Sequence, residues 1–157
     1  MHPNEALLRE FYEAFNRGDG QTMAAAYADS ARFTDPVFPD LDGTGAGAMW
    51  RMLTESADDL RIEASNFEAD DDQGSAHWEA WYTFGATGRK VHNKIDATFR
   101  FEDGKIVRHI DSFPFWRWSR QALGIPGVLL GWTPVLKGMV RSQAAGSLKK
   151  WRAKNPD

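Results

Sequence analysis

The sequence contains no cysteine among its 157 residues. Disulfides, zinc ribbons and thiol catalysis are therefore excluded, and a reducing compartment is permitted. A run of apolar residues long enough to span a bilayer is also missing, because the stretch from Ile125 to Leu136 is short and interrupted by glycine and proline. The N-terminus lacks the basic and then apolar layout of a signal peptide. We therefore expect a cytoplasmic protein and no membrane contact.

An excess of positive charge is absent as well, since the formal net charge is −3. We accordingly expect no nucleic-acid partner. The charge is unevenly placed, however. From Pro134 onward the only acid is Asp157, and the basic residues are Lys137, Arg141, Lys149, Lys150, Arg152 and Lys154. A solvated helix face accounts for this pattern, and an acidic partner or a membrane surface is the alternative.

Large rings are abundant, with seven Trp and ten Phe. Because such rings dominate the energetics of cores and pockets, we expect one domain with an aromatic interior. Apolar residues at helical spacing predict helices over 4–16, 21–28, 46–57 and 115–123, and a further helix starting at Thr133-Pro134. Between them, a short strand at 32–35 and alternating strands over 60–69, 75–84 and 90–101 are predicted.

The stretch from Phe99 to Phe113 has the pattern of a hairpin whose turn is Asp103-Gly104. Alternation places Val107, His109, Asp111 and Phe113 on one face of its second strand. An imidazole and a carboxylate would thus share an apolar face, which indicates the floor of a ligand pocket. Helices followed by consecutive hairpins predict an α+β fold, with helices packed on one face of a curved antiparallel sheet.

Three stretches resemble the nuclear-transport-factor-2-like superfamily, in its SnoaL-like and ketosteroid-isomerase-like branch. They are Phe11 to Asp19, Tyr27 to Val37 with its Asp35-Pro36, and the strand and turn from Phe99 to Val107. The resemblance implies a cone-shaped curved antiparallel sheet wrapped around the N-terminal helices over 1–114, with a C-terminal helical extension over 115–157. It also implies an apolar cavity for a hydrophobic small molecule and a homodimer joined through the outer face of the sheet.

The resemblance suggests Asp35, His109 and Asp111 as catalytic residues. Asp35 stands where ketosteroid isomerases place a proton-shuttling carboxylate, although an Asp before Pro also caps turns. Asp111 stands where cyclases and epoxide hydrolases place an acid or base, with His109 as its orienting partner, although a buried polar pair bonded to the backbone fits the pattern too. The isomerase oxyanion donors are replaced by Phe11 and Ala97, so steroid isomerisation by that route is not expected. The arginine and second aspartate of the epoxide-hydrolase triad are also absent.

The same faces predict the lining of the pocket. Its expected members are Phe11, Phe15, Trp50, Trp78, Tyr82, Phe84, Asn93, Phe99, Phe101 and Phe113, although any of the rings could simply fill the core. The outer face is expected to carry His77, Glu79, Trp81, Thr83, Asp96, Thr98 and Arg100, a mixture typical of a dimer interface. No metal site is expected, because His77 and Glu79 lack further ligands.

Three functions fit these observations. The first is an isomerase, cyclase or hydrolase that transfers protons by general acid–base catalysis and needs no cofactor. The second is a non-catalytic protein that binds a hydrophobic ligand in the same pocket. The third is an interaction domain that acts through its C-terminal helices. Whether the chain is an enzyme stays open at this point, because one fold hosts all three functions.

Overall fold

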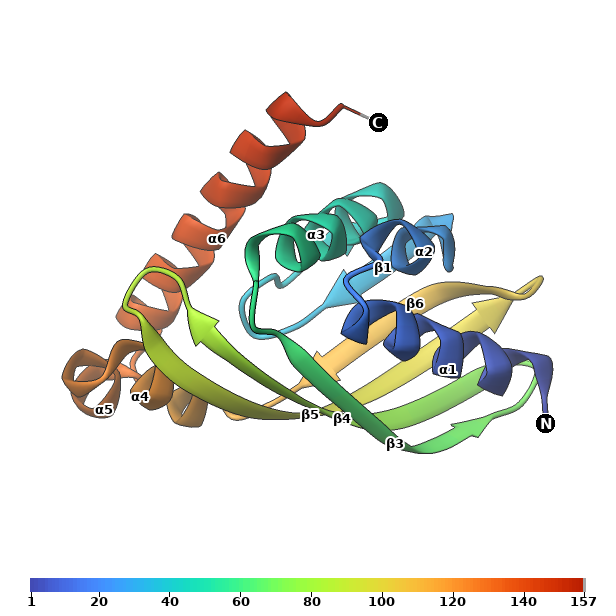
Figure 1. Cartoon of the computed structure of the whole chain (residues 1–157), viewed down its shortest axis with the longest axis horizontal. Coiled ribbons are helices and arrows are strands. Elements are labelled where there is room, and N and C mark those ends of the chain that lie inside the picture. Colours follow the sequence, from blue (N-terminus) through green and yellow to red (C-terminus); the bar gives the residue numbers. More distant parts are fainter. Residues whose placement is uncertain (157) are drawn as a thin grey trace.

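A six-stranded curved sheet, in the order β2-β1-β6-β5-β4-β3, wraps around helix α1 in the computed structural model, which describes residues 1–156 (Figure 1). In chain order the elements are α1 (Pro3–Asn16), α2 (Gly20–Ala25), β1 (Tyr27–Thr34), β2 (Leu41–Asp42), α3 (Gly43–Ser56), β3 (Arg61–Ala69), β4 (Gln73–Phe84), β5 (Arg89–Glu102), β6 (Lys105–Ser112), α4 (Phe115–Leu123), α5 (Ile125–Leu130) and α6 (Pro134–Lys154). The predicted α+β fold, with its curved sheet and C-terminal helical extension, is confirmed.

Helix α1 places its apolar stripe against the inner face of the sheet. Its first turn is closed by Pro3 and by the His2 ring, which accepts a hydrogen bond from the backbone N–H of Asn4. Leu8, Phe11, Tyr12 and Phe15 are buried on the side facing the strands. The spacing of these four residues therefore decides which ring systems reach the interior.

Strand β1 begins at Tyr27, where the sequence pattern predicted the end of a helix at residue 28. Helix α2 ends earlier, and Ile106 of β6 donates a backbone hydrogen bond to Ala26. Strand β1 then runs parallel to β6. The sheet is therefore mixed rather than wholly antiparallel, because this long-range pairing outweighs the local helical preference of 26–28.

The hairpin between β5 and β6 turns at Asp103 and Gly104, whose φ angles of 51° and 73° are those of a type I′ turn. A bulge follows, since Phe101 pairs with Ile106 whereas Arg100 pairs with Arg108. Val107 is the extra residue, and Ile106 is fully buried. The prediction that Val107 shares the face of His109 is therefore wrong, because one inserted residue reverses the alternation.

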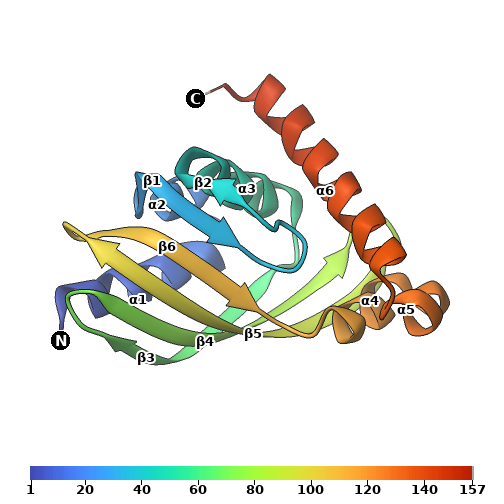
Figure 2. The ribbon, with the colours of Figure 1, turned by 180° about the vertical axis from the view of Figure 1, so that it is seen from behind.

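The C-terminal helices lie beyond the last strand, and Figure 2 shows α6 running diagonally back toward α3. Helix α4 matches the predicted 115–123, whereas α5 occupies a segment for which no helix was predicted. Helix α6 is held by Arg141, which donates to the Pro36 carbonyl, and by Trp151, which donates to Glu55. The division of the chain at residue 114 stays a prediction.

Candidate active site

A chain of hydrogen bonds crosses the interior and ends at Asp111. The indole Nε1 of Trp50 donates to the Tyr27 hydroxyl at 2.8 Å, and that hydroxyl lies 2.7 Å from Nδ1 of His109. Nε2 of His109 lies 2.9 Å from Oδ1 of Asp111. The same oxygen accepts the indole N–H of Trp78 at 3.2 Å. Four side chains, one each from α3, β1, β4 and β6, are thus linked to one carboxylate oxygen, and two of them, His109 and Trp78, bond to it directly.

The hydrogen-bond donors determine where the protons lie along this series of hydrogen bonds. The Tyr27 oxygen already accepts from Trp50, so its own proton has His109 Nδ1 as its partner. Nε2 then carries the imidazole proton and donates it to Asp111. Every proton is bonded in this arrangement, whereas a second proton on the ring would leave the Tyr27 hydroxyl proton unpaired. The geometry therefore favours a neutral imidazole beside an ionised carboxylate.

Aromatic rings surround His109 and leave its side chain with no exposed surface. The rings of Phe99 and Phe33 lie 4.3 and 4.9 Å from the imidazole centroid, and Trp50 stacks on it at 6.2 Å. Both ring nitrogens are used within the protein. His109 therefore orients Asp111 through its hydrogen bond and is not itself positioned to touch a ligand.

Asp111 keeps one carboxylate oxygen without a partner. Oδ1 receives both hydrogen bonds, and Oδ2 receives none from residues 1–156. Asp111 is 3% exposed, in contrast to the fully enclosed His109. A carboxylate with one oxygen fixed and the other free is the arrangement that a general base requires.

Asp35 lies in the turn after β1 and is half-buried. Its Oδ1 accepts hydrogen bonds from the backbone N–H groups of Val37 and Phe38, so it does cap the turn. Burial of the carboxyl group raises the pKa of Asp35 to about 7, and the negative charge of Asp111 contributes in the same direction. Near neutral pH, Asp35 therefore keeps its proton for part of the time.

Two tyrosine hydroxyls lie near these acids. Burial and then the charge of Asp111 raise the pKa of Tyr12 well above its ordinary value, and its hydroxyl is buried without a hydrogen-bond partner among the described residues. The Tyr82 hydroxyl accepts the indole N–H of Trp118 at 2.8 Å. Burial, followed by a smaller effect of Asp35, raises the pKa of Tyr82 to about 12. Both phenols therefore stay protonated and can donate.

Sequence reasoning missed Tyr12, Tyr27 and Trp118 as site residues. Tyr12 belongs to the predicted apolar stripe of the first helix, one residue after the position where the isomerase tyrosine was sought. Its buried hydroxyl was the available signal, because a phenol on an apolar helix face needs a partner. Tyr27 was assigned to a helix, so its direction along a strand could not be inferred.

The structure distributes the predicted lining residues over two regions. Phe11, Phe15, Trp50, Trp78 and Phe99 pack around His109 and Asp111, and Phe101 stacks on Phe99 one step farther along β5. Phe84 is partly buried against a second cluster formed by Val91, Phe115, Trp118 and Ala122, and Tyr82 and Phe113 pack against both clusters. Asn93 is buried on β5. Their roles in ligand binding stay predictions.

The outer face of the sheet carries a separate polar chain. His77 bonds to Asp96 and Glu79, and His92 bonds to the other oxygen of Glu79. Neighbouring Asp96, and then Glu79, raise the pKa of His77. Within residues 1–156, no three side chains of the metal-binding types form a group that could hold a metal ion.

Comparisons with known proteins agree with the observed fold. A family model described as a SnoaL-like domain matches residues 8–109. No curated protein matches the sequence. Among solved structures, an NTF2-like protein of unknown function from Burkholderia pseudomallei is 23% identical, covers 78% of this chain and 99% of its own, and has a TM-score of 0.68.

Two further solved structures share the fold. A proposed polyketide cyclase from Xanthomonas campestris is 23% identical, with a TM-score of 0.63, and covers 76% of this chain and 96% of its own. An LEH-like epoxide hydrolase from M. tuberculosis is 17% identical, with a TM-score of 0.62, and covers 82% of this chain and 96% of its own. At these identities the likeness extends to the fold alone.

Proposed function

This chain belongs to the SnoaL-like domain family, and we propose that it is a cofactor-independent enzyme that moves protons on a small hydrophobic molecule. The substrate class that best fits two acids and two phenols in an aromatic interior is an apolar compound with a carbonyl group. Isomerisation and aldol-type cyclisation begin with such proton transfers, and hydration requires a base that takes a proton from water.

In the proposed mechanism, Asp111 Oδ2 removes a proton from the carbon next to the carbonyl. The C–H electron pair moves into the carbon–carbon bond, and the carbonyl oxygen becomes an enolate. Protonated Asp35 or the Tyr12 hydroxyl donates a hydrogen bond or a proton to that oxygen. His109 keeps Asp111 oriented throughout, and its neutral state leaves the negative charge on the base.

The observation that carries the proposal is the contrast between two neighbouring carboxyl groups. Asp111 accepts two N–H hydrogen bonds on one oxygen and leaves its other oxygen free. Asp35 is held by burial near a pKa of about 7 and keeps a proton for transfer. Two titratable groups whose environments differ in this way are typical of acid–base catalysis.

The test is base-catalysed hydrogen exchange. A panel of apolar enolisable ketones in D₂O is incubated with the protein, and loss of the α-proton signal is followed by NMR. Asp111→Asn should slow catalysed exchange by roughly 100-fold or more, because the free oxygen becomes an amide nitrogen. Asp96→Asn on the outer face is the matched control and should leave exchange unchanged. Equal rates in wild type and Asp111→Asn would contradict the proposal.

A non-catalytic binding protein is the second candidate, and the complete enclosure of His109 favours it, since this hydrogen-bond chain would also serve a purely structural core. Such a protein would bind apolar ketones, as shown by ligand-induced changes in its NMR spectrum, without exchanging their protons. The exchange assay therefore separates the two candidates.

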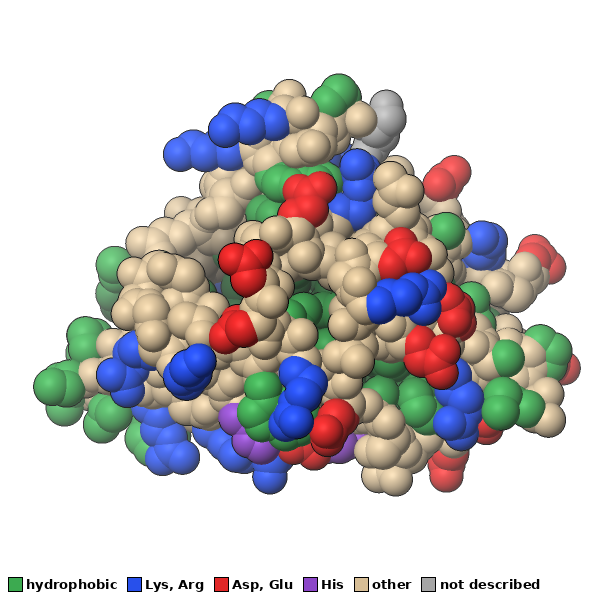
Figure 3. Space-filling view, in the orientation of Figure 1, with side chains coloured by type: hydrophobic (Ala, Val, Ile, Leu, Met, Phe, Trp, Pro, Cys, Tyr) green, Lys and Arg blue, Asp and Glu red, His purple; other side chains and the backbone are tan. Residues whose placement is uncertain are grey.

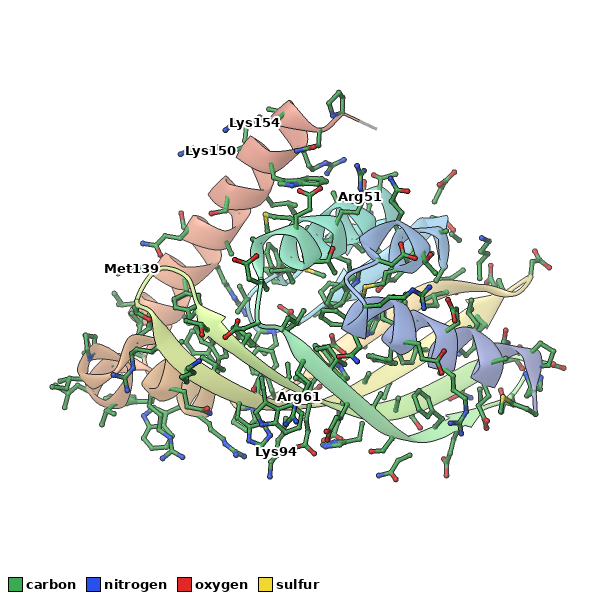
Figure 4. All side chains as sticks on the ribbon, in the orientation of Figure 1. Arg51, Arg61, Lys94, Met139, Lys150 and Lys154 are labelled. Carbon is green, nitrogen blue, oxygen red and sulfur yellow. The ribbon has the colours of Figure 1, made fainter. Side chains whose placement is uncertain are left out.

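We also propose a homodimer through the outer face of the sheet. A hollow of about 580 Å³ there is lined by residues of β3 to β6, including Arg100 and Arg108. Figure 4 places Arg61 and Lys94 on this side of the molecule, and the Arg61 guanidinium lies 4.1 Å from the Trp81 ring centroid. Stacked arginine and tryptophan beside hydrogen-bonded histidines is a composition that suits an interface.

A further inference from the structure

The C-terminal helices end in a protruding group of exposed apolar side chains, here named the apolar tip. It consists of Trp116, Ile125, Val128, Leu129, Leu130, Trp132, Val135 and Met139. Ile125, Trp132 and Val135 are each about three-quarters exposed, at 75%, 75% and 74%. Figure 3 shows hydrophobic side chains gathered at this end of the molecule, with Lys and Arg beside them. Elsewhere in residues 1–156, Met1 is the one large hydrophobic residue counted as exposed.

The tip is a fixed structure, because α4 and α5 touch backbone to backbone. A Cβ on Gly127 would collide with the Ser119 carbonyl oxygen, and one on Gly131 would collide with the Ser119 hydroxyl. That hydroxyl is fully buried and bonds to the Trp116 and Gly127 carbonyls. The apolar side chains are therefore displayed on a rigid support.

The carbonyl groups at the end of α5 all have hydrogen-bond partners within the protein. A helix leaves its last four carbonyls unpaired, and outside water each such group is costly. Here Gly127 accepts from Gly131 N–H, Val128 from the Trp116 indole, Leu129 from the Trp132 indole, and Leu130 from the backbone and hydroxyl of Thr133. Both exposed indoles thus use their only donor internally, and neither they nor the carbonyls need water.

The charge around the tip has one sign. Between Ser112 and Pro156 the sequence contains no acid, and Arg117, Arg120 and Lys137 belong to two of the helices that carry the tip. The Arg120 guanidinium lies 4.7 Å from the Trp116 ring centroid, and the Lys137 ammonium lies 5.8 Å from that of Phe115. None of the three forms an ion pair with a carboxylate among the described residues.

We propose that the apolar tip docks onto the surface of an anionic phospholipid bilayer. The apolar side chains would enter the boundary between headgroups and acyl chains, and the three basic residues would face the lipid phosphates. This contact is peripheral, since no helix in residues 1–156 has the length and apolar character needed to cross a membrane. It revises the expectation of no membrane contact and does not depend on the proposed catalysis.

A second copy of the chain fits the tip less well. Pairing two tips face to face would bring Arg117, Arg120 and Lys137 of both copies together, and like charges in one interface repel. Pairing the tip with another part of a second copy requires an exposed apolar partner surface, and Met1 alone does not supply one. An anionic bilayer satisfies both the apolar and the basic residues.

The experiment is co-sedimentation with vesicles of phosphatidylcholine alone and of equal parts phosphatidylcholine and phosphatidylglycerol. The full chain should bind the anionic vesicles and lose binding as salt is raised. Replacing Leu129 and Leu130 together by serine should weaken binding roughly tenfold or more. Thermal unfolding of this variant checks that its fold is intact.

Two charge-reversal variants supply the matched control. Arg120→Glu and Lys154→Glu change the net charge equally, and both residues lie exposed in the last turn of a helix. Figure 4 places Lys150 and Lys154 at the end of α6 opposite Met139. Arg120→Glu should weaken binding at least about fivefold, and Lys154→Glu clearly less. Absence of vesicle binding, equal effects of the two variants, or a change of oligomeric state on replacing Leu129 and Leu130 would each overturn the proposal.

Discussion

His109 and Asp111, two residues apart on β6, are joined by a hydrogen bond of 2.9 Å from the ring Nε2 to the carboxylate Oδ1. Strand geometry places the two side chains on one face, but it does not align them. Tyr27 fixes the ring from the other nitrogen, and Trp78 holds the same carboxylate oxygen. The second oxygen is thereby left free in a defined direction, and the proposed chemistry rests on it.

Asp35 should make stability depend on pH. Its pKa rises from 3.8 in the unfolded chain to about 7 in the folded protein, so the folded state binds the proton more tightly. The free energy of unfolding should therefore fall as pH rises from about 4 to about 7, by an amount on the order of 2–4 kcal/mol at most. Asp35→Asn should flatten this dependence. Urea unfolding of both proteins from pH 4 to pH 8 measures this pH dependence. The same dependence in wild type and Asp35→Asn would contradict the raised pKa of Asp35.

Removal of the hydroxyl group should affect protein stability differently at two buried tyrosines, Tyr12 and Tyr27. Tyr12→Phe removes an unpartnered hydroxyl, so stability should stay equal or rise, while catalysed exchange should fall roughly tenfold or more. Tyr27→Phe leaves the Trp50 indole N–H and His109 Nδ1 without partners and should cost about 1–3 kcal/mol or more. Chemical unfolding compares the two variants. A larger loss of stability for Tyr12→Phe would show that its hydroxyl is bonded after all.

Two glycines in the C-terminal helices offer another matched pair. Gly127→Ala would drive a methyl group into the Ser119 carbonyl and should destabilise the packing of α5 on α4 by about 1–3 kcal/mol. Gly138 on α6 has open space at its Cβ position, so Gly138→Ala should raise helix stability by about 0.5–1 kcal/mol. Thermal unfolding provides both values. Similar effects of the two substitutions would mean that α4 and α5 are not closely packed.

The proposed dimer can be tested at Trp81, which is stacked between Arg61 and His92 on the outer face. Trp81→Glu should convert the dimer to a monomer, because it places a charge in the centre of the interface. Trp132→Glu in the apolar tip is the same substitution at a distant site and should leave the dimer intact. Light scattering after size exclusion gives the masses. A monomeric wild type, or dissociation only by Trp132→Glu, would refute this interface.

The class of fold follows from local patterns in the sequence. Helical and alternating periodicities are local properties, and they placed α1, the long strands and α4 within a few residues of their observed bounds. The turn at Asp103-Gly104 was also readable, because both residues tolerate the positive φ that a type I′ turn requires. Strand alternation then brought His109 and Asp111 to one face without knowledge of any distant contact.

The assembly of the candidate site depends on contacts between residues that are far apart in the sequence. The start of β1 at Tyr27 depends on pairing with β6, some 80 residues away in sequence, and this pairing directs the Tyr27 hydroxyl to His109. The bulge at Val107 depends on the register of two strands, so alternation alone placed Ile106 on the wrong face. The pKa of Asp35 depends on burial and on Asp111, and neither is a property of the local sequence. Periodicity determines which side of an element faces inward, whereas register and burial determine which groups meet there.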